Sequence, residues 1–206
     1  PEWTPIRMEE MHSSGLLTHP TQRADGSILL IGHRDAIHFF DGRPDLTGAT
    51  GLQLEALTDG DLFMNGPGRE GPWGLEEVTV SAKPPGTEQW QPLRLGQPSA
   101  DFSGPERIET RPASADGKQP EKKIAHGPVA RLVDGDPDTS WEPDRGHLLR
   151  HQPSVAVVRF DAPLDLPPDT ELKFVVRMTG GNATRMLACG RISLTTAPEP
   201  AAPPVD

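Results

Sequence analysis

The sequence predicts an all-β fold, a β-sandwich or jelly roll, and three observations carry that prediction. The 206 residues include 24 Pro and 21 Gly, which disfavours long helices and favours short strands joined by turns. About eight to ten short segments show the alternation or the apolar runs of strands. No stretch shows the apolar period of a long amphipathic helix. With 34% hydrophobic residues and a mean hydropathy of −0.51, the core must be thin.

The first half of the predicted sandwich comprises residues 1–82. An Asp25-Gly26 turn precedes residues 27–32, whose apolar run predicts a buried strand. Residues 51–57 alternate strictly, which predicts a strand with one packed face and one face in water. Further strands are expected at residues 3–11, 36–40 and 75–80, with turns or loops at residues 13–21 and 59–72.

The second half comprises residues 88–197, so that residues 1–197 form a single domain. Residues 154–160 have the strongest pattern of a core strand. Residues 103–127 are rich in Gly, Pro, Ser, Lys and Glu, which predicts a mobile insertion or long surface loop. The Pro- and Ala-rich residues 198–206 are expected to be a tail or linker. Other strands are expected at residues 92–100, 171–178 and 190–196.

Charge and composition exclude several classes of partner and cofactor. The net charge of −10 disfavours a phosphate backbone, and 5% aromatic residues with no Tyr disfavour single-stranded nucleic acid, so no nucleic-acid partner is expected. The only cysteine, Cys189, can form no internal disulfide, and without a C-x-x-C-H motif no covalent haem is expected. No run of 18 apolar residues occurs, so the sequence predicts no membrane span.

The most informative stretch is residues 132–141, where an apolar pair leads into an acidic turn and then into Trp141. The pattern indicates the end of a strand, an oxygen-rich loop and an aromatic side chain that returns to the core. Carboxylates, hydroxyls and carbonyls are the ligands that Ca²⁺ prefers. An EF-hand is excluded because Thr139 occupies its sixth position and Arg145 its twelfth. A metal-free, hydrogen-bonded turn is the alternative, since Asp and Thr also satisfy turn amides.

The pattern D-G-D-x-x-T-x-W at residues 134–141 resembles the signature of discoidin-like (galactose-binding-like) β-sandwich domains, which include many bacterial carbohydrate-binding modules. The resemblance implies a structural Ca²⁺ in this loop. The ligands that it implies are the side chains of Asp134 and Thr139 and the carbonyls of Arg131, Asp136 and Thr139.

In that superfamily a Glu from a distant strand completes the calcium site. Only residues 75–80 have the required pattern, apolar-x-Glu-apolar-x-apolar, which places Glu77 in the ligand position with the Glu76 carbonyl beside it. The family strand usually closes the domain, whereas here it precedes the loop. The resemblance therefore implies a circularly permuted or fused half-sandwich arrangement.

A longer resemblance covers most of the chain outside residues 103–127 and the tail. The order of its motifs is similar to a non-catalytic segment of large exported proteins of the planctomycete cytochrome-c type. Two departures are Leu-Gln-Leu-Glu at residues 52–55, where Leu-Arg-Leu-Glu is expected, and Cys189. The motifs lie at residues 3–5, 25–29, 52–57, 66–69, 75–78, 134–141 and 189–194.

The sequence predicts no enzyme. A serine hydrolase needs its nucleophile on a strained turn, and no G-x-S-x-G motif occurs. Glu76 and Glu77 cannot flank one glycosidic bond, because adjacent residues of a strand point to opposite faces. His147 and His151 have the spacing of a helical zinc pair, but the flanking glycine and proline indicate a loop.

A sugar site would need an aromatic face and hydrogen-bonding side chains on loops at one end of the sandwich. The alternative is that the candidates are ordinary loop residues. The candidates are Trp73, Trp90, Arg145, His147 and Arg185.

These observations predict a non-catalytic, calcium-stabilised module that binds carbohydrate or another extracytoplasmic ligand within a larger exported protein. The alternative is a structural domain that packs against a redox (cytochrome-c) or catalytic domain or a partner subunit. The chain begins Pro-Glu-Trp without Met, which fits a segment of a longer precursor. A periplasmic or extracellular location is expected, because weak Ca²⁺ sites suit the outside of the cytoplasm.

Overall fold

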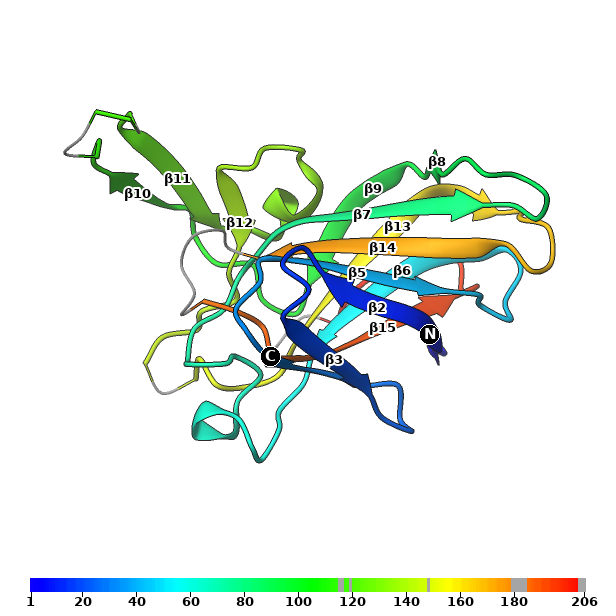
Figure 1. Ribbon diagram of the computed structural model, residues 1–206, viewed down its shortest axis with the longest axis horizontal. Coiled ribbons are helices and arrows are strands. Elements are labelled where there is room, and N and C mark those ends of the chain that lie inside the picture. Colours follow the sequence, from blue (N-terminus) through cyan, green and yellow to red (C-terminus); the bar gives the residue numbers. More distant parts are fainter. Residues whose placement is uncertain (115–116, 119, 148, 179–184, 204–206) are drawn as a thin grey trace.

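The computed structural model describes the chain except for residues 115–116, 119, 148, 179–184 and 204–206. The described residues form two β-sheets and two short 3-10 turns, η1 (Phe63–Asn65) and η2 (Val129–Val133), so the predicted all-β class is confirmed (Figure 1). Sheet A contains β1 (Thr4–Pro5), β3 (Thr18–Gln22), β4 (Ile28–Gly32), β6 (Ala49–Ala56), β9 (Leu95–Ala100), β13 (Ser154–Leu164) and β15 (Cys189–Thr195). Sheet B contains β2 (Met8–Ser13), β5 (Ile37–Gly42), β7 (Leu75–Lys83), β8 (Gln91–Pro92), β10 (Arg107–Arg111), β11 (Lys122–Gly127), β12 (Thr139–Trp141) and β14 (Glu171–Met178).

Sheet A is antiparallel, in the order β3-β4-β15-β6-β13-β9, with β1 paired to β15. The expectation of one wet face for β6 is wrong, since Gln53 is buried as well as Leu52 and Leu54. Pro200 packs against this strand at Gly51. The contact is so close that a Cβ atom added to Gly51 would lie only 2.5 Å from the Cγ of Pro200. The C-terminal segment therefore covers the outer side of the central strand.

Sheet B has the order β10-β11-β12-β7-β14-β5-β2, with β8 paired to β7. Its strands are antiparallel except for β11 and β12, which run parallel. Residues 103–127, predicted to be a mobile insertion or long surface loop, are not simply a loop, because this stretch contributes β10 and β11 as an antiparallel hairpin. All five β10 side chains are exposed, and the hairpin projects from the sandwich (Figure 1). Few of the hairpin's side chains are buried, which is why its sequence lacks an apolar alternation.

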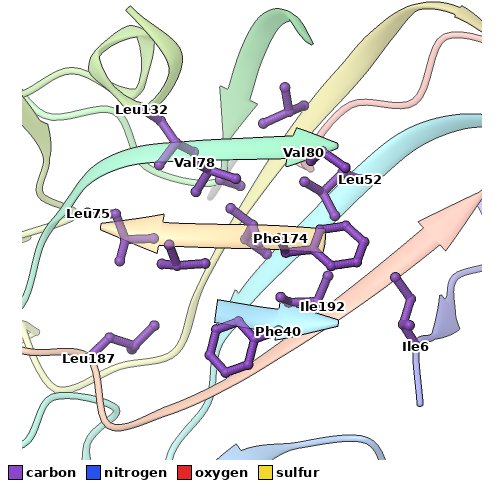
Figure 2. Packing of buried hydrophobic residues seen from close by; sticks show 14 of the residues in the cluster. Ile6, Phe40, Leu52, Leu75, Val78, Val80, Leu132, Phe174, Leu187 and Ile192 are labelled. Atoms are coloured by element: carbon purple, nitrogen blue, oxygen red, sulfur yellow. The ribbon is translucent and has the colours of Figure 1, made fainter. Parts of the chain in front are cut away.

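The hydrophobic core lies between the two sheets. Alternate residues of β7 and β14 point inward, such as Val78, Val80 and Phe174, and meet Leu52 and Ile192 of sheet A (Figure 2). Their alternation is the period-2 pattern that predicted these strands. Each fully buried side chain of this size contributes about 1.5–3 kcal/mol relative to exposure. One face of β7 therefore serves the core, which leaves Glu77 on the other face.

Two further expectations from composition are corrected. Residues 18–22, expected in a turn, form β3, an edge strand whose Pro20 is tolerated because an edge strand needs fewer ladder donors. The segment after residue 197, expected to be a tail or linker, packs on the sandwich as far as Ala202, which is buried and whose amide donates to Ser99 Oγ at 2.9 Å.

Neither helical turn in the described part of the chain has the length or apolar character to cross a membrane.

A buried histidine should make stability depend on pH. His38 of β5 has 0% exposure, and among the described residues neither of its ring nitrogens has a hydrogen-bond partner. Burial lowers the pKa of His38 below 6.5, with Asp35 opposing. The unfolded chain therefore binds this proton more readily, and the free energy of unfolding should fall as pH drops through about 6.5 and below. Urea unfolding at about pH 5 and pH 7.5 should show a smaller loss for His38→Leu than for the wild type. Equal losses would contradict this assignment.

Candidate metal centre and ligand-binding residues

The acidic loop closes on itself through side-chain contacts. Asp134 Oδ1 accepts hydrogen bonds from the amide of Asp136 at 3.0 Å and from the Thr139 hydroxyl at 2.9 Å. Asp136 Oδ1 accepts the Asp138 amide at 2.9 Å in the same way. Gly135 has φ +74°, a conformation that other residues rarely adopt, which allows the tight bend. The loop thus brings the Asp134 carboxylate to the Thr139 hydroxyl at the first residue of β12, and this hydroxyl also donates to the Asp136 carbonyl at 3.1 Å.

Glu77 of β7 meets this loop. Its Oε2 accepts a hydrogen bond from the Gly135 amide at 2.9 Å, although 58 residues separate the two in sequence. The pairing of β12 with β7, through Trp141 and Leu75, sets this position. The sequence prediction that Glu77 lies beside the loop of residues 134–139 therefore matches the geometry.

The surroundings of Glu77 disfavour the charged form of its carboxyl group. The pKa of Glu77 is raised to about 7, mainly by burial and to a smaller extent by the nearby carboxylate of Asp134, while the Gly135 hydrogen bond and Arg177 oppose the shift. Arg131 partly balances Asp134, with Nη1 3.3 Å from Oδ2. A carboxylate that is costly to ionise beside a second carboxylate is a place where a cation would be favourable.

The remaining members of the predicted ligand set lie on the neighbouring backbone. Arg131 lies in η2, directly before the loop, and its guanidinium also pairs with Glu106. Glu76 lies where the register of β7 against β14 shifts, between the pairs Glu77–Arg177 and Leu75–Met178. Glu76 is therefore the neighbour of Glu77 within β7, and Arg131 lies three residues before Asp134; their role as carbonyl ligands stays a prediction.

The donor set fits a hard cation better than a transition metal. It comprises two carboxylates and a hydroxyl, with the loop carbonyls, and contains only oxygen. Among the described residues no group of three or more His, Cys, Asp or Glu side chains could hold a metal ion. Glu77, Asp134 and Thr139 would therefore depend on backbone oxygens to complete a shell around Ca²⁺.

Trp73, which precedes β7, and Trp141, the last residue of β12, belong to the core. Trp73 is 4% exposed and packs edge-on against Trp141, with ring centroids 5.4 Å apart. This corrects the expectation that Trp73 offers its ring to a sugar. The signal missed was the glycine-rich context, because residues 66–74 include four glycines that allow the chain to turn inward.

The polar candidates Arg145, His147 and Arg185 are either engaged in internal contacts or exposed. The Arg145 side chain is buried, donates from Nη2 to Asp101 Oδ2 at 2.7 Å and stacks on Phe102. Arg185 Nη1 donates to Glu142 Oε1 at 2.8 Å. His147 is exposed in a turn. Arg145 therefore has a structural role, and the loop end offers His147 and part of Arg185 to a ligand.

Trp90 lies at the other end of sheet B from these residues. It follows β7, whose last residue is Lys83, whereas Trp141 pairs with Leu75 at the first residue of β7. The ammonium groups of Lys83 and Lys173 lie 4.7 Å and 4.2 Å from the centroid of the Trp90 ring. The structure therefore does not gather the predicted sugar-binding residues into one site.

Sequence reasoning missed a buried carboxylate, Glu142. It is 3% exposed, and its oxygens accept hydrogen bonds from Arg107 at 2.9 Å and Arg185 at 2.8 Å. His126 Nδ1 lies 3.2 Å from Glu142 and 2.7 Å from Ser140 Oγ. The only hint in the sequence is that Glu142 directly follows Trp141. Its partners lie up to 43 residues away, so no local pattern points to this network.

Comparison with known proteins gives no match to this chain, whether among family models, curated proteins or solved structures.

Proposed function

We propose that this chain is a non-catalytic binding module, a discoidin-like β-sandwich stiffened by Ca²⁺ between the loop of residues 134–139 and β7. The hydrogen bond from the Gly135 amide to Glu77 Oε2 carries the proposal, because it joins the two distant segments named from the sequence. Glu77, Asp134 and Thr139 would hold the ion through side chains, with the carbonyls of neighbouring residues. The bound ion would supply positive charge that offsets the paired carboxylates and fixes the loop on the sheet.

A circular permutation accounts for the order of the segments. In this chain the strand that carries Glu77 precedes the acidic loop, yet Trp141 at the end of the loop pairs with Leu75 at the start of that strand. This pairing brings the loop and the strand together although the strand comes first in the chain, which supports a permuted discoidin-like or jelly-roll arrangement.

Thermal unfolding with EDTA and then with excess CaCl₂ tests the metal. An ion that binds only the folded state at 100 times its dissociation constant adds about 2.7 kcal/mol to the free energy of unfolding. For a chain of this size, that raises Tm by about 5–11 °C. The response should vanish in Glu77→Ala and persist in Glu76→Ala, whose backbone carbonyl is unchanged. An identical Tm in EDTA and CaCl₂ would leave a metal-free turn as the correct description.

The proposed ligand is carbohydrate, or another ligand outside the cytoplasm, with this module forming part of a larger exported protein. Trp90 supports a sugar because its partly exposed indole ring lies among hydrogen-bonding side chains. The proposed location is the periplasm or the extracellular space, where Ca²⁺ is abundant enough for such a site.

One observation favours the second candidate function, a structural domain that packs against a redox or catalytic domain or a partner subunit. Phe63 and Met64 of η1 are exposed, and so is Leu149. The Phe63 ring contacts the ring of His151, with centroids 5.6 Å apart, and Leu149 is two residues before His151. These two loops therefore present apolar side chains near one another, as surfaces that bind other proteins do.

A further inference from the structure

The outer face of sheet B carries an ordered row of hydrogen-bonding side chains. The strand register places Ser81 of β7 beside Lys173 of β14, Lys173 beside Asp41 of β5, and Asp41 beside Glu10 of β2. These four residues alternate with inward-facing core residues such as Phe174 and therefore point away from the other sheet. We call them the polar row. The four strands lie next to one another across the sheet (Figure 1).

Aromatic side chains flank the polar row on both sides. Trp90 lies at one side, beneath the ammonium groups of Lys83 and Lys173. Two residues along the strands in the other direction, the rings of Phe39 and His12 stack with centroids 4.8 Å apart and an interplanar angle of 12°. Outward-facing residues of a sandwich are usually polar, so outward aromatic rings beside a polar row are unusual.

A hollow of about 400 Å³ lies over the Trp90 side of the row. Asp41, which lines it, is 5% exposed, and its Oδ1 has no hydrogen-bond partner among the described residues. Burial raises the pKa of Asp41, while Lys173, 3.3 Å from Oδ2, opposes the shift. An unsatisfied buried acceptor is costly, so a donor that reaches it gains free energy. Because Oδ1 is shielded from solvent, such a donor reaches it only if neighbouring side chains shift.

The charges around the hollow favour a neutral ligand. Its lining includes four carboxylates and three cations. Arg43 pairs with Glu9 and Glu171, Lys83 pairs with Glu171, and Lys173 pairs with Asp41. Each cation already has an acidic partner, and the chain carries a net charge of −10, so a polyanion would gain little here. Hydroxyl groups can use such donors and acceptors without a net charge.

We propose that this face, bounded by Trp90, the polar row and the Phe39–His12 pair, binds a neutral oligosaccharide. The inference rests on the proposed binding function and replaces the loop end with the outer face of sheet B as the place of the sugar. The aromatic rings contact the apolar faces of sugar rings, and the polar row bonds the hydroxyls, among them a donor to Asp41. From Thr79 to Lys83 and from β7 to β2 the face measures about 14 Å in each direction. It therefore accommodates more than one sugar ring.

The test is a titration of the ¹⁵N-labelled protein with neutral gluco-, manno- and xylo-oligosaccharides of increasing length, followed by amide and indole signals. A polygalacturonate oligomer serves as the anionic probe. We expect shifts in β2, β5, β14 and the Trp90 indole, and an affinity that rises from mono- to trisaccharide. Trp90→Ala and Asp41→Asn should each weaken binding about tenfold or more. His147→Ala, at the other end of the sandwich, should bind as the wild type does.

The possible results distinguish a wrong location of the sugar site from the absence of carbohydrate binding. Loss of binding in His147→Ala with retention in Trp90→Ala and Asp41→Asn would overturn the site and leave a carbohydrate-binding module with its ligand at the loops. Binding of the polygalacturonate oligomer alone would overturn the neutral ligand. If no oligosaccharide shifts any wild-type signal at about 10 mM, both this inference and the carbohydrate function fail. Circular dichroism melting of each variant confirms that the fold is retained.

Discussion

Replacing Trp141 with alanine should lower the free energy of unfolding by about 3–5 kcal/mol, the usual cost of a large aromatic removed from a core. The Trp141 side chain is 1% exposed, packs edge-on with Trp73, and donates from Nε1 to the Phe102 carbonyl at 3.1 Å. The substitution removes the apolar contact, opens a cavity and leaves that carbonyl without its donor. For a chain of this size the loss corresponds to a decrease in Tm of about 6–20 °C.

The measurement is urea unfolding followed by circular dichroism, with Trp90→Ala as the matched control. Trp90 is partly exposed, and the ammonium groups of two lysines lie over its ring, so its loss should cost about 1 kcal/mol or less. Similar losses in the two variants would contradict the role of Trp141 as the core residue that follows the acidic loop.

Glu142→Ala should destabilise the chain by about 3 kcal/mol and should release the β10–β11 hairpin first. A paired charge that loses its buried partner usually costs about 3–5 kcal/mol. Here the Arg107 and Arg185 side chains are 46% and 32% exposed and regain water, which places the expected loss at the lower end. Arg107 lies on β10 and His126 on β11, so Glu142 joins both strands to the body of sheet B.

Hydrogen exchange resolves this effect by segment. In Glu142→Ala the amides of β10 and β11 should exchange faster while those of β6, β13 and β15 keep their protection. Thr110→Ala is the control, because Thr110 is an exposed residue of the same hairpin. Equal acceleration in all strands would mean that Glu142 supports the whole fold, and no acceleration would mean that backbone pairing alone holds the hairpin.

The strands that could be predicted are those whose two faces differ. In β7 and β14 one face meets the core and the other faces outward, so burial leaves a period of two in the sequence. That period is absent from β10, whose side chains are all exposed, and it is misleading in β6, whose outer side Pro200 covers. Strand pairing and tail packing depend on contacts between distant segments, which no local window records.

The candidate metal centre was more accessible to sequence reasoning than the ligand-binding residues. Residues 134–141 are contiguous, and the strand of Glu77 has a pattern of its own, so their meeting could be predicted from a resemblance. In contrast, the polar row takes one residue from each of four strands and depends on strand order and register. Trp73 was expected at the surface because it lies in a loop, but position in a loop does not determine how deeply a side chain is buried.

The position of β15 bears on how the chain acquires its structure. β15, formed by residues 189–195, lies between β4 and β6 in sheet A, and β14 likewise lies between β7 and β5 in sheet B. Neither sheet can close around its central strand until these late residues have left the ribosome. Non-local pairing of this kind slows folding and leaves unpaired strand edges open to association meanwhile. A nascent or truncated chain that stops before residue 189 should therefore need a chaperone to protect these strand edges. A complete chain that folds after synthesis has all of its strands available for pairing at once.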